Sequence, residues 1–301
     1  MEITGDLNVS IEERTLIDMH SVLNVLNVLI FEFSALSEHL GGVPEIDGMH
    51  DRVVETAELL RDPDEASRQV ANVDRFIEDA ERVIASEVAN TGSEGDPVVQ
   101  AIVGNVRSIF SILEVRAAEI VARAEDPLAW VNHDVRKLKN NFVSVLQAIE
   151  RNSMGGYRIV YNLAEHEAGY YMVTFNISSV SGATIAMPAV FQDVMRDLLA
   201  NARKYTPPGG SITAGLHHSG DELRYVVSDT GMGIPPDEIS RVVRFGFRGS
   251  NVGDRPTRGG GFGLTKAYHV TRMFGGRMWI DSPVVGGVGT RIEIRLPAPN
   301  R

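Results

Sequence analysis

The 301-residue sequence has no cysteine, no excess of basic residues and no long apolar run. The absence of cysteine excludes disulfides, thiol catalysis and cysteine-ligated metals, which suits a reducing compartment. The formal net charge of -11 argues against a nucleic acid partner or an anionic membrane surface. No apolar run approaches the roughly 20 residues needed to span a bilayer, and the opening MEITGDLNVS lacks the basic and apolar regions of a signal peptide. These absences predict a protein with no membrane insertion.

The first half of the chain predicts helices joined by short turns, which is typical of an antiparallel bundle. Gly41, Gly42 and Pro44 end the first helix, and Asp62 with Pro63 marks a break or kink in the second. The expected helices run from about Ser10 to Leu40, Ile46 to Ala89, Val98 to Ala124 and Pro127 to Asn152.

The second half predicts strands that alternate with helices, beyond a hinge at Gly155 and Gly156. The expected strands are Tyr157–Tyr161, Tyr171–Ile177, Ser211–His217, Leu223–Asp229, Met278–Asp281 and Arg291–Leu296. We therefore expect an α + α/β fold, with a helical bundle over residues 1–153 and an α/β sandwich over residues 154–301.

The second half also carries glycine-rich and asparagine-bearing segments whose order and spacing predict one nucleotide pocket. Each alone would be a weak signal, because glycine-rich turns are ordinary between strands and helices. The segments are DLLANARKYT (197–206), DTGMGI (229–234), GGGFGLTKA (259–267) and GGVGTRIEIRLP (286–297).

The first of these segments predicts an amphipathic helix whose apolar side packs on a sheet. Asp193, Asp197, Asn201 and Lys204 are expected on its other side. Asp197 and Asn201 lie one turn apart, so their oxygens could face a hydrated Mg²⁺ that nucleotide phosphates also hold. Lys204 follows at a position suited to a phosphate.

The glycine-rich segments supply the remaining chemistry of such a pocket. Asp229 ends a predicted strand, where its carboxylate can accept a hydrogen bond from the exocyclic amine of adenine. The glycines that follow let the backbone approach a flat base. Gly259, Gly261 and Gly263 open a predicted helix, whose free amides and dipole favour phosphate.

Together these segments resemble the ATP-binding domain of the sensor histidine kinases and of the wider superfamily they share with gyrase-type and chaperone ATPases, over residues 157–297. The resemblance implies ATP and Mg²⁺ as cofactors, Asn201 as the Mg²⁺ ligand and Asp229 as the residue that reads adenine. The implied cofactor-binding residues are Asn201, Lys204, Tyr205, Asp229, Gly231, Gly233, Ile234, Phe245, Phe247, Arg258, Gly259, Gly260, Gly261, Phe262, Gly263, Leu264 and Thr290, with Gly287 and Gly289 in the closing glycine box.

The chain departs from the family pattern at three positions. Asp197 stands where many of these kinases carry Asn and where the related ATPases carry an acidic general base. Water, as well as a histidine, could therefore accept the phosphoryl group. Gly246 stands in the phenylalanine box, where a longer side chain is common, and predicts a mobile lid. Phe262 replaces the usual Leu of the second glycine box.

Two histidines are candidates for the phosphoacceptor that the resemblance implies. His20 is favoured, because it lies on a first helix followed by a second and has Asn24 one turn later. His133 is the alternative, because HDVRKLKNNF resembles the family's H box, with Asp134 as the orienting carboxylate. We expect His133 on the solvent face of the last bundle helix.

The resemblance implies a cytoplasmic, homodimeric histidine kinase that phosphorylates its own bundle and passes the phosphoryl group to an aspartate of a separate response regulator. Two alternatives stay open at this point. One is a kinase-like scaffold or phosphotransferase that binds ATP without efficient autophosphorylation. The other is a GHKL-type ATPase with Asp197 as the general base.

Overall fold

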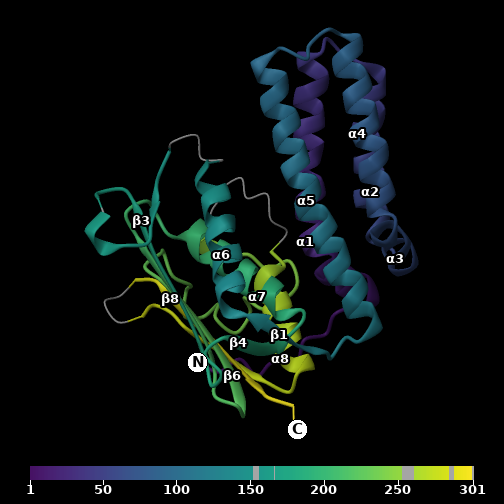
Figure 1. The fold of residues 1–301 in the computed structure, drawn as a ribbon. Helices are drawn as coiled ribbons and strands as arrows, with labels where there is room; N and C mark the ends of the chain where they lie inside the picture. The colour runs from purple at the N-terminus through teal and green to yellow at the C-terminus, as the bar shows by residue number, and fades with distance from the viewer. Residues whose placement is uncertain (152–155, 166, 253–260, 285–287, 300–301) are drawn as a thin grey trace. The chain divides into compact units, whose positions relative to one another are not determined.

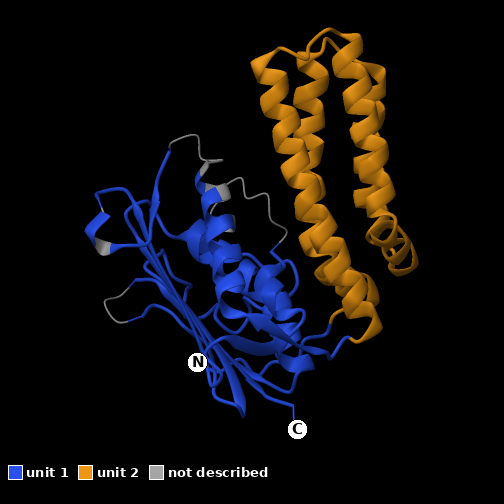
Figure 2. Cartoon of the chain, in the orientation of Figure 1, with its two compact units in different colours: residues 1–8, 127–301 blue, residues 9–126 orange. Residues whose placement is uncertain are grey.

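The computed structural model describes residues 1–151, 156–165, 167–252, 261–284 and 288–299. The chain divides into two compact units, coloured separately in Figure 2. The helical unit is Val9–Asp126, and the α/β unit combines Met1–Asn8 with Pro127–Arg301. The fold class expected from the sequence is confirmed, whereas the division falls at Asp126 and not at residue 153.

The helical unit begins its helices at clear capping signals. Ser10 and Glu13 form a reciprocal capping box at the start of α1. Asp62 and Asp96 cap α3 and α5, and in both a proline follows at the first helical position. The helices are α1 (Ile11–His39), α2 (Pro44–Leu59), α3 (Pro63–Ala71), α4 (Val73–Asn90) and α5 (Pro97–Glu125).

The four long helices of this unit close a bundle around one apolar core. Both α1 and α4 pack against α2 and α5. On α1 the core positions recur every three or four residues, as in Val22, Leu26, Leu29, Phe33 and Leu36, none more than 2% exposed. The expected second helix, from about Ile46 to Ala89, is in fact three helices. The chain reverses at the short α3 and brings α4 back beside α2 (Figure 1).

Two of these helices, α1 and α5, are long and apolar enough to cross a membrane by length and composition. In the most apolar stretch of 18 residues, 39% of the residues are buried in α1 and 28% are buried in α5. Core helices of soluble proteins pass the same test, so this is weak evidence of a span. The absence of membrane insertion stays a prediction.

The α/β unit is built on a six-stranded mixed sheet of order β2-β3-β5-β6-β8-β7. The pairs from β2 to β5 are parallel and the others are antiparallel. All six strands expected from the sequence are confirmed. They are β2 (Ile159–Val160), β3 (Tyr171–Ser179), β5 (Ser211–His218), β6 (Glu222–Asp229), β7 (Arg277–Asp281) and β8 (Thr290–Pro297).

Three helices cover one face of this sheet (Figure 1) and enclose the core of the unit with it. Strand residues alternate between this core and the opposite face, so Leu223, Tyr225 and Val227 of β6 are at most 2% exposed. The helices are α6 (Val135–Arg151), α7 (Phe191–Tyr205) and α8 (Gly263–Met273), with short 3₁₀ turns at Leu163–Glu165 and Ser250–Val252.

The expected fourth bundle helix from Pro127 to Asn152 is wrong in its first part and in its partners. Trp130–Asp134 forms the strand β1, which pairs antiparallel with β4 (Thr184–Pro188). The helix α6 begins only at Val135, where the Asp134 carboxylate accepts a hydrogen bond of 2.8 Å from the Lys137 amide. Its apolar stripe faces the α/β core. That stripe includes Leu138, Phe142 and Leu146.

The segment Met1–Asn8 lies on the free edge of β7, although the helical unit separates the two in the sequence. The Ile3 amide donates to the Met278 carbonyl at 2.9 Å, and the Ile280 amide donates to the Met1 carbonyl at 2.9 Å. Ile3 is 4% exposed within the core, and the Tyr268 hydroxyl donates to the Gly5 carbonyl at 2.6 Å. The segment therefore covers an edge that would otherwise carry unpaired backbone groups.

Candidate functional site

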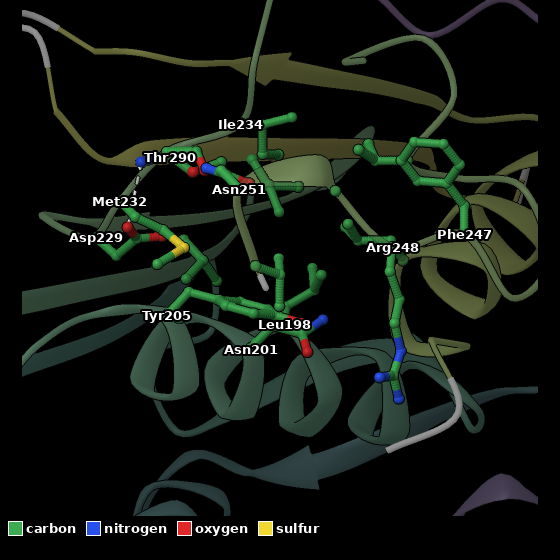
Figure 3. A pocket seen from close by; sticks show the side chains of 18 residues that line it. Leu198, Asn201, Tyr205, Asp229, Met232, Ile234, Phe247, Arg248, Asn251 and Thr290 are labelled. Atoms are coloured by element: carbon green, nitrogen blue, oxygen red, sulfur yellow. Dashed lines mark hydrogen bonds between the residues drawn. The ribbon is translucent and has the colours of Figure 1, made fainter. Parts of the chain in front are cut away.

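A pocket opens between α7, the ends of β6 and β8, and the segment that follows residue 232 (Figure 3). Its empty space of about 730 Å³ includes some open solvent and lies within the range of small-molecule sites. The lining residues are Leu198, Asn201, Ala202, Tyr205, Val227, Asp229, Met232, Gly233, Ile234, Val242, Phe247, Arg248, Gly249, Asn251, Val252, Leu264, Thr290 and Ile292.

The helix α7 forms one wall of this pocket. Figure 3 shows Leu198, Asn201 and Tyr205 rising from it toward the cavity. The helix packs on the sheet through the apolar residues expected from the sequence, and this prediction is confirmed. The buried set is Phe191, Val194, Met195, Leu198, Leu199 and Ala202. Asn201 therefore reaches the pocket because the apolar stripe fixes the rotation of the helix.

The start of α8 lies directly against the polar side of α7. A Cβ atom on Gly263 would come within 2.9 Å of Asn201 Nδ2 and 3.5 Å of Asp197 Cβ. Any side chain at position 263 would therefore push the Asn201 amide aside. The unpaired amides of that turn, which favour anions, thus lie beside the oxygens expected to hold a cation.

Asp229 lies at the opposite end of the pocket from Arg248, beside Thr290 (Figure 3). Its Oδ1 accepts two backbone hydrogen bonds, from Gly231 at 2.8 Å and from Thr290 at 3.2 Å. No hydrogen bond from the described residues reaches its Oδ2. Burial raises the pKa of Asp229, and the two backbone donors oppose that rise. A partly desolvated carboxylate with one free oxygen is suited to accept from a ligand amine.

The loop that carries this carboxylate is fixed from both sides. A Cβ atom on Gly231 would lie 2.5 Å from the Tyr205 carbonyl, so the loop can pass the end of α7 only with glycine there. The Gly289 amide donates to the Gly231 carbonyl at 2.8 Å, and the Ile234 amide donates to Ser282 Oγ at 2.7 Å. The two expected glycine boxes are therefore bound to each other at the pocket.

Aromatic and polar contacts hold the segments around residues 238–252 and 261–262 that lie beside the pocket. The rings of Phe245 and Phe262 stack at 4.5 Å between centroids, which gives the substituted Phe262 a partner in the expected phenylalanine box. The Asn251 side chain donates to the Gly233 carbonyl at 3.0 Å. Both carboxylate oxygens of Glu238, which is 6% exposed, lie within 3.2 Å of the Ser250 amide.

Positive charge gathers near the end of α7. Burial, and then the charges of Arg248 and Arg203, lower the pKa of Lys204. The Lys204 ammonium lies 5.2 Å from the centre of the Tyr205 ring. An anionic ligand there would be attracted by several cations and would favour the charged form of Lys204.

The structure brings eight of the expected cofactor-binding residues into the pocket wall. They are Asn201, Tyr205, Asp229, Gly233, Ile234, Phe247, Leu264 and Thr290. Asp197, Lys204, Gly231, Phe245, Gly261, Phe262 and Gly263 are not among its lining residues. Arg258, Gly259, Gly260 and Gly287 lie outside the described residues.

Sequence reasoning missed part of the wall. Arg248 and Gly249 end the RFGFRG phenylalanine box, and Asn251 and Val252 follow it closely; all four line the pocket. Their place in or beside that motif is the signal that could have found them. Met232 lies within the quoted DTGMGI segment and also lines the pocket.

The two candidate phosphoacceptors lie in different units. His20 lies on α1 and is 8% exposed, and the Asn24 amide nitrogen lies 3.1 Å from its Nε2. This contact joins the His20 ring to the next turn of α1. The expected position of His133 on a solvent-facing helix is wrong. It lies on strand β1, and its Nδ1 is 3.1 Å from the Gln192 amide nitrogen.

Comparison with known proteins gives the pocket a family. Residues 186–300 match the family model described as histidine kinase-, DNA gyrase B-, and HSP90-like ATPase. The sensor histidine kinase Hik2 of Thermosynechococcus vestitus is 39% identical over 108 residues, which are 36% of this chain and 28% of that protein. The adaptive-response sensory kinase SasA of Synechococcus elongatus is 37% identical over 113 residues, 37% of this chain and 28% of that protein.

Among solved structures, a mycobacterial sensor histidine kinase, MprB, is similar over 56% of this chain and 97% of that chain, with 23% identity and a TM-score of 0.40. The chain thus matches 28% of the length of each of the two curated relatives. The matched region contains α7, α8 and every residue of the pocket. Residues 186–300 therefore form a domain of the histidine kinase-, DNA gyrase B-, and HSP90-like ATPase family.

Proposed function

We propose that this protein is a protein-histidine kinase that binds Mg-ATP, phosphorylates His20 of its own helical unit and passes the phosphoryl group to an aspartate of a response regulator. The observation that carries the proposal is the environment of Asp229. Its Oδ1 is held by two backbone amides in a pocket that the family match assigns to an ATPase domain. Its Oδ2 would accept the hydrogen bond of the adenine amine.

Asn201 is the proposed side-chain ligand of Mg²⁺. The described residues contain no group of three or more His, Asp or Glu side chains that could hold a metal. A site with Asn201 as its one protein ligand suits Mg²⁺, because this ion keeps much of its water and is also bound by nucleotide phosphates. The bound ion would withdraw charge from the phosphates, while the first turn of α8 and the cations near Lys204 would orient them.

His20 is the proposed acceptor because it lies on the first helix of the helical unit and has Asn24 one turn later. In the transfer, Nε2 bonds to the γ-phosphorus, the bond from that phosphorus to the bridging oxygen breaks, and ADP leaves with the electron pair. Asn24 would release Nε2 for this step. His133 is disfavoured, since it lies within the α/β unit on β1 and its neighbour Asp134 caps α6.

The proposal extends to assembly and location. Apolar side chains remain exposed on the neighbouring helices α1 and α5, and they favour a homodimer through the helical unit. They are Val28, Phe31, Ile112 and Val115, each at least 37% exposed. The lack of cysteine suits a cytoplasmic protein. The names of the relatives support a two-component partner, namely a receiver domain that takes the phosphoryl group.

Incubation of the protein with γ-labelled ATP and Mg²⁺ tests this function. We expect label that survives alkali and is lost in acid, as phosphohistidine behaves. Release of labelled phosphate without protein label would indicate an ATPase. Neither label nor release would indicate a scaffold.

A further inference from the structure

Lys266 is a buried charge that the proposed chemistry does not use. It lies on α8, one turn after Gly263, and its side chain is 1% exposed. Its ammonium lies 3.1 Å from Asp193 Oδ2 and 3.7 Å from Asp197 Oδ2. An ammonium removed from water needs an opposite charge close by, so these two carboxylates of α7 account for its position.

Asp197 is the second carboxylate within 4.0 Å of the Lys266 ammonium. Asp193 is 2% exposed and also forms an ion pair with Arg196, one turn along α7. Arg196 can thus neutralise Asp193. Lys266 and Asp197 are then left as the second pair of opposite charges, and each removes the cost of burying the other.

Asp197 lies close to the place where phosphates are expected. It precedes Asn201 by one turn, and a Cβ atom on Gly263 would lie 3.5 Å from its Cβ. A free carboxylate beside the start of α8 could therefore accept a proton from a water molecule. Its Oδ2 is instead buried, and it faces the Lys266 ammonium. Asp197 is not among the residues that line the pocket.

We infer that Lys266 is a positioning residue that holds the Asp197 carboxylate toward α8. Held there, Asp197 does not activate water, and the γ-phosphoryl group of ATP is transferred to a histidine. The inference rests on the proposed function. In the reaction that Lys266 suppresses, the oxygen of water bonds to the γ-phosphorus and its proton passes to the Asp197 carboxylate. The bond to the bridging oxygen breaks, and ADP leaves with the electron pair.

The test compares phosphate release from ATP and Mg²⁺ by four proteins: wild type, Lys266→Met, Lys266→Met with Asp197→Asn, and Lys139→Met. Lys139 is an exposed lysine on α6 and controls for the loss of one positive charge. We expect Lys266→Met to raise phosphate release by about tenfold or more, since a general base contributes roughly 10²- to 10⁴-fold. The double variant should lose the added release, because no carboxylate remains at position 197.

A second readout needs no nucleotide. Thermal unfolding of the four combinations at positions 266 and 197 forms a double-mutant cycle. We expect the double variant to melt closer to wild type than the sum of the two single shifts, because neither charge is then buried alone. Lys266→Gln keeps a donor for Asp193 and replaces Lys266→Met if that variant does not fold.

Two results would overturn the inference. One is phosphate release that does not rise in a folded Lys266 variant, or that rises equally whether residue 197 is Asp or Asn. The other is failure of both Lys266 variants to fold, which would leave Lys266 as a structural counter-ion of Asp193. Failure of the proposed function is distinguishable, because no protein would then carry acid-labile label while the order of phosphate release could still hold.

Discussion

Asp229 is a partly buried carboxylate whose ionised form costs stability in the absence of a ligand. Burial raises its pKa, so the ionised side chain lowers the stability of the ligand-free protein. The sign follows from linkage: the folded state binds the proton more tightly, so stability declines as pH rises from the unfolded to the folded pKa. A residue that costs stability and faces a pocket is expected to act on a ligand.

We predict that Asp229→Asn weakens ATP binding by about ten- to a hundredfold, because a hydrogen bond to a charged group is worth roughly 1.5 to 3 kcal/mol. The amide oxygen can still accept from Gly231 and Thr290, so the melting temperature without nucleotide should not fall. Calorimetric titration measures the affinity, with inosine triphosphate, which lacks the adenine amine, as the control. Equal weakening for both nucleotides would mean that Asp229 supports the loop and not base recognition.

The buried ion pair between Asp193 and Lys266 could not be predicted from the sequence. The apolar stripe of α7 could be predicted from its spacing, and Asp193 was then expected on the exposed side. It is 2% exposed, because α8 covers that side and supplies a lysine. No spacing within one helix reveals a pair formed between two helices.

Glu293 is the most strongly shifted acid on the sheet. It lies on the face of β8 opposite the core residues Ile292 and Ile294, and Arg224, Arg291 and Arg295 each pair with it at 2.5 to 2.7 Å. These arginines, Arg224 first, lower its pKa from the usual 4.5 of a glutamate to about 2.

We predict that the ionised Glu293 side chain adds roughly 1 to 3 kcal/mol to the free energy of unfolding above pH 4.5. This figure allows for solvent screening of the partly exposed arginines. A lowered folded pKa means that this contribution is present at neutral pH and is lost as pH falls from 4.5 toward 2. The difference in unfolding free energy between wild type and Glu293→Gln should therefore shrink from pH 7 to pH 3, as urea titrations would measure. A constant difference would exclude the ion-pair explanation.

At the scale of elements, local signals could be predicted and partners could not. The strands of the main sheet and the amphipathic α7 follow from periodicity and flanking glycines. Strand β1 was missed because Val131 fits the helical stripe of α6. Its partner β4 also lies far along the chain, in the register Val131 to Met187. The apolar stripe of α6 also does not reveal whether the helix packs on the bundle or on the α/β core.

The edge segment before the bundle gives a prediction at this scale. Ile3→Ala should destabilise the α/β unit by about 2 to 5 kcal/mol, because it leaves a cavity in the core. Both tryptophans, Trp130 and Trp279, lie in this unit, so their fluorescence in urea reports its unfolding alone. Ile11→Ala is the matched control, since Ile11 is 76% exposed at the start of α1. Equal effects would show that the segment does not belong to the core.

For the whole molecule, the helical unit closes its bundle within one chain and still exposes apolar side chains. Phe31 is 57% exposed, whereas Phe33, two residues away, is fully buried. The first side chain adds to the exposed apolar surface of α1, whereas the second belongs to the core.

We predict that Phe31→Glu shifts the protein from dimer to monomer in sedimentation measurements while circular dichroism stays unchanged, because a charge would face the partner across an apolar contact. Val180→Glu is the control, since Val180 is 75% exposed on the α/β unit. A dimer that survives Phe31→Glu would place the interface elsewhere.

The most direct test of the proposed function is the fate of the label from γ-labelled ATP in the His20→Gln and His133→Gln variants, both checked for folding. We predict that His20→Gln removes the acid-labile label and that His133→Gln leaves most of it. His20 lies on α1 of the helical unit with Asn24 one turn later, whereas His133 lies on β1 of the α/β unit. Label retained by His20→Gln and lost by His133→Gln would contradict the account and assign the phosphoacceptor to the strand.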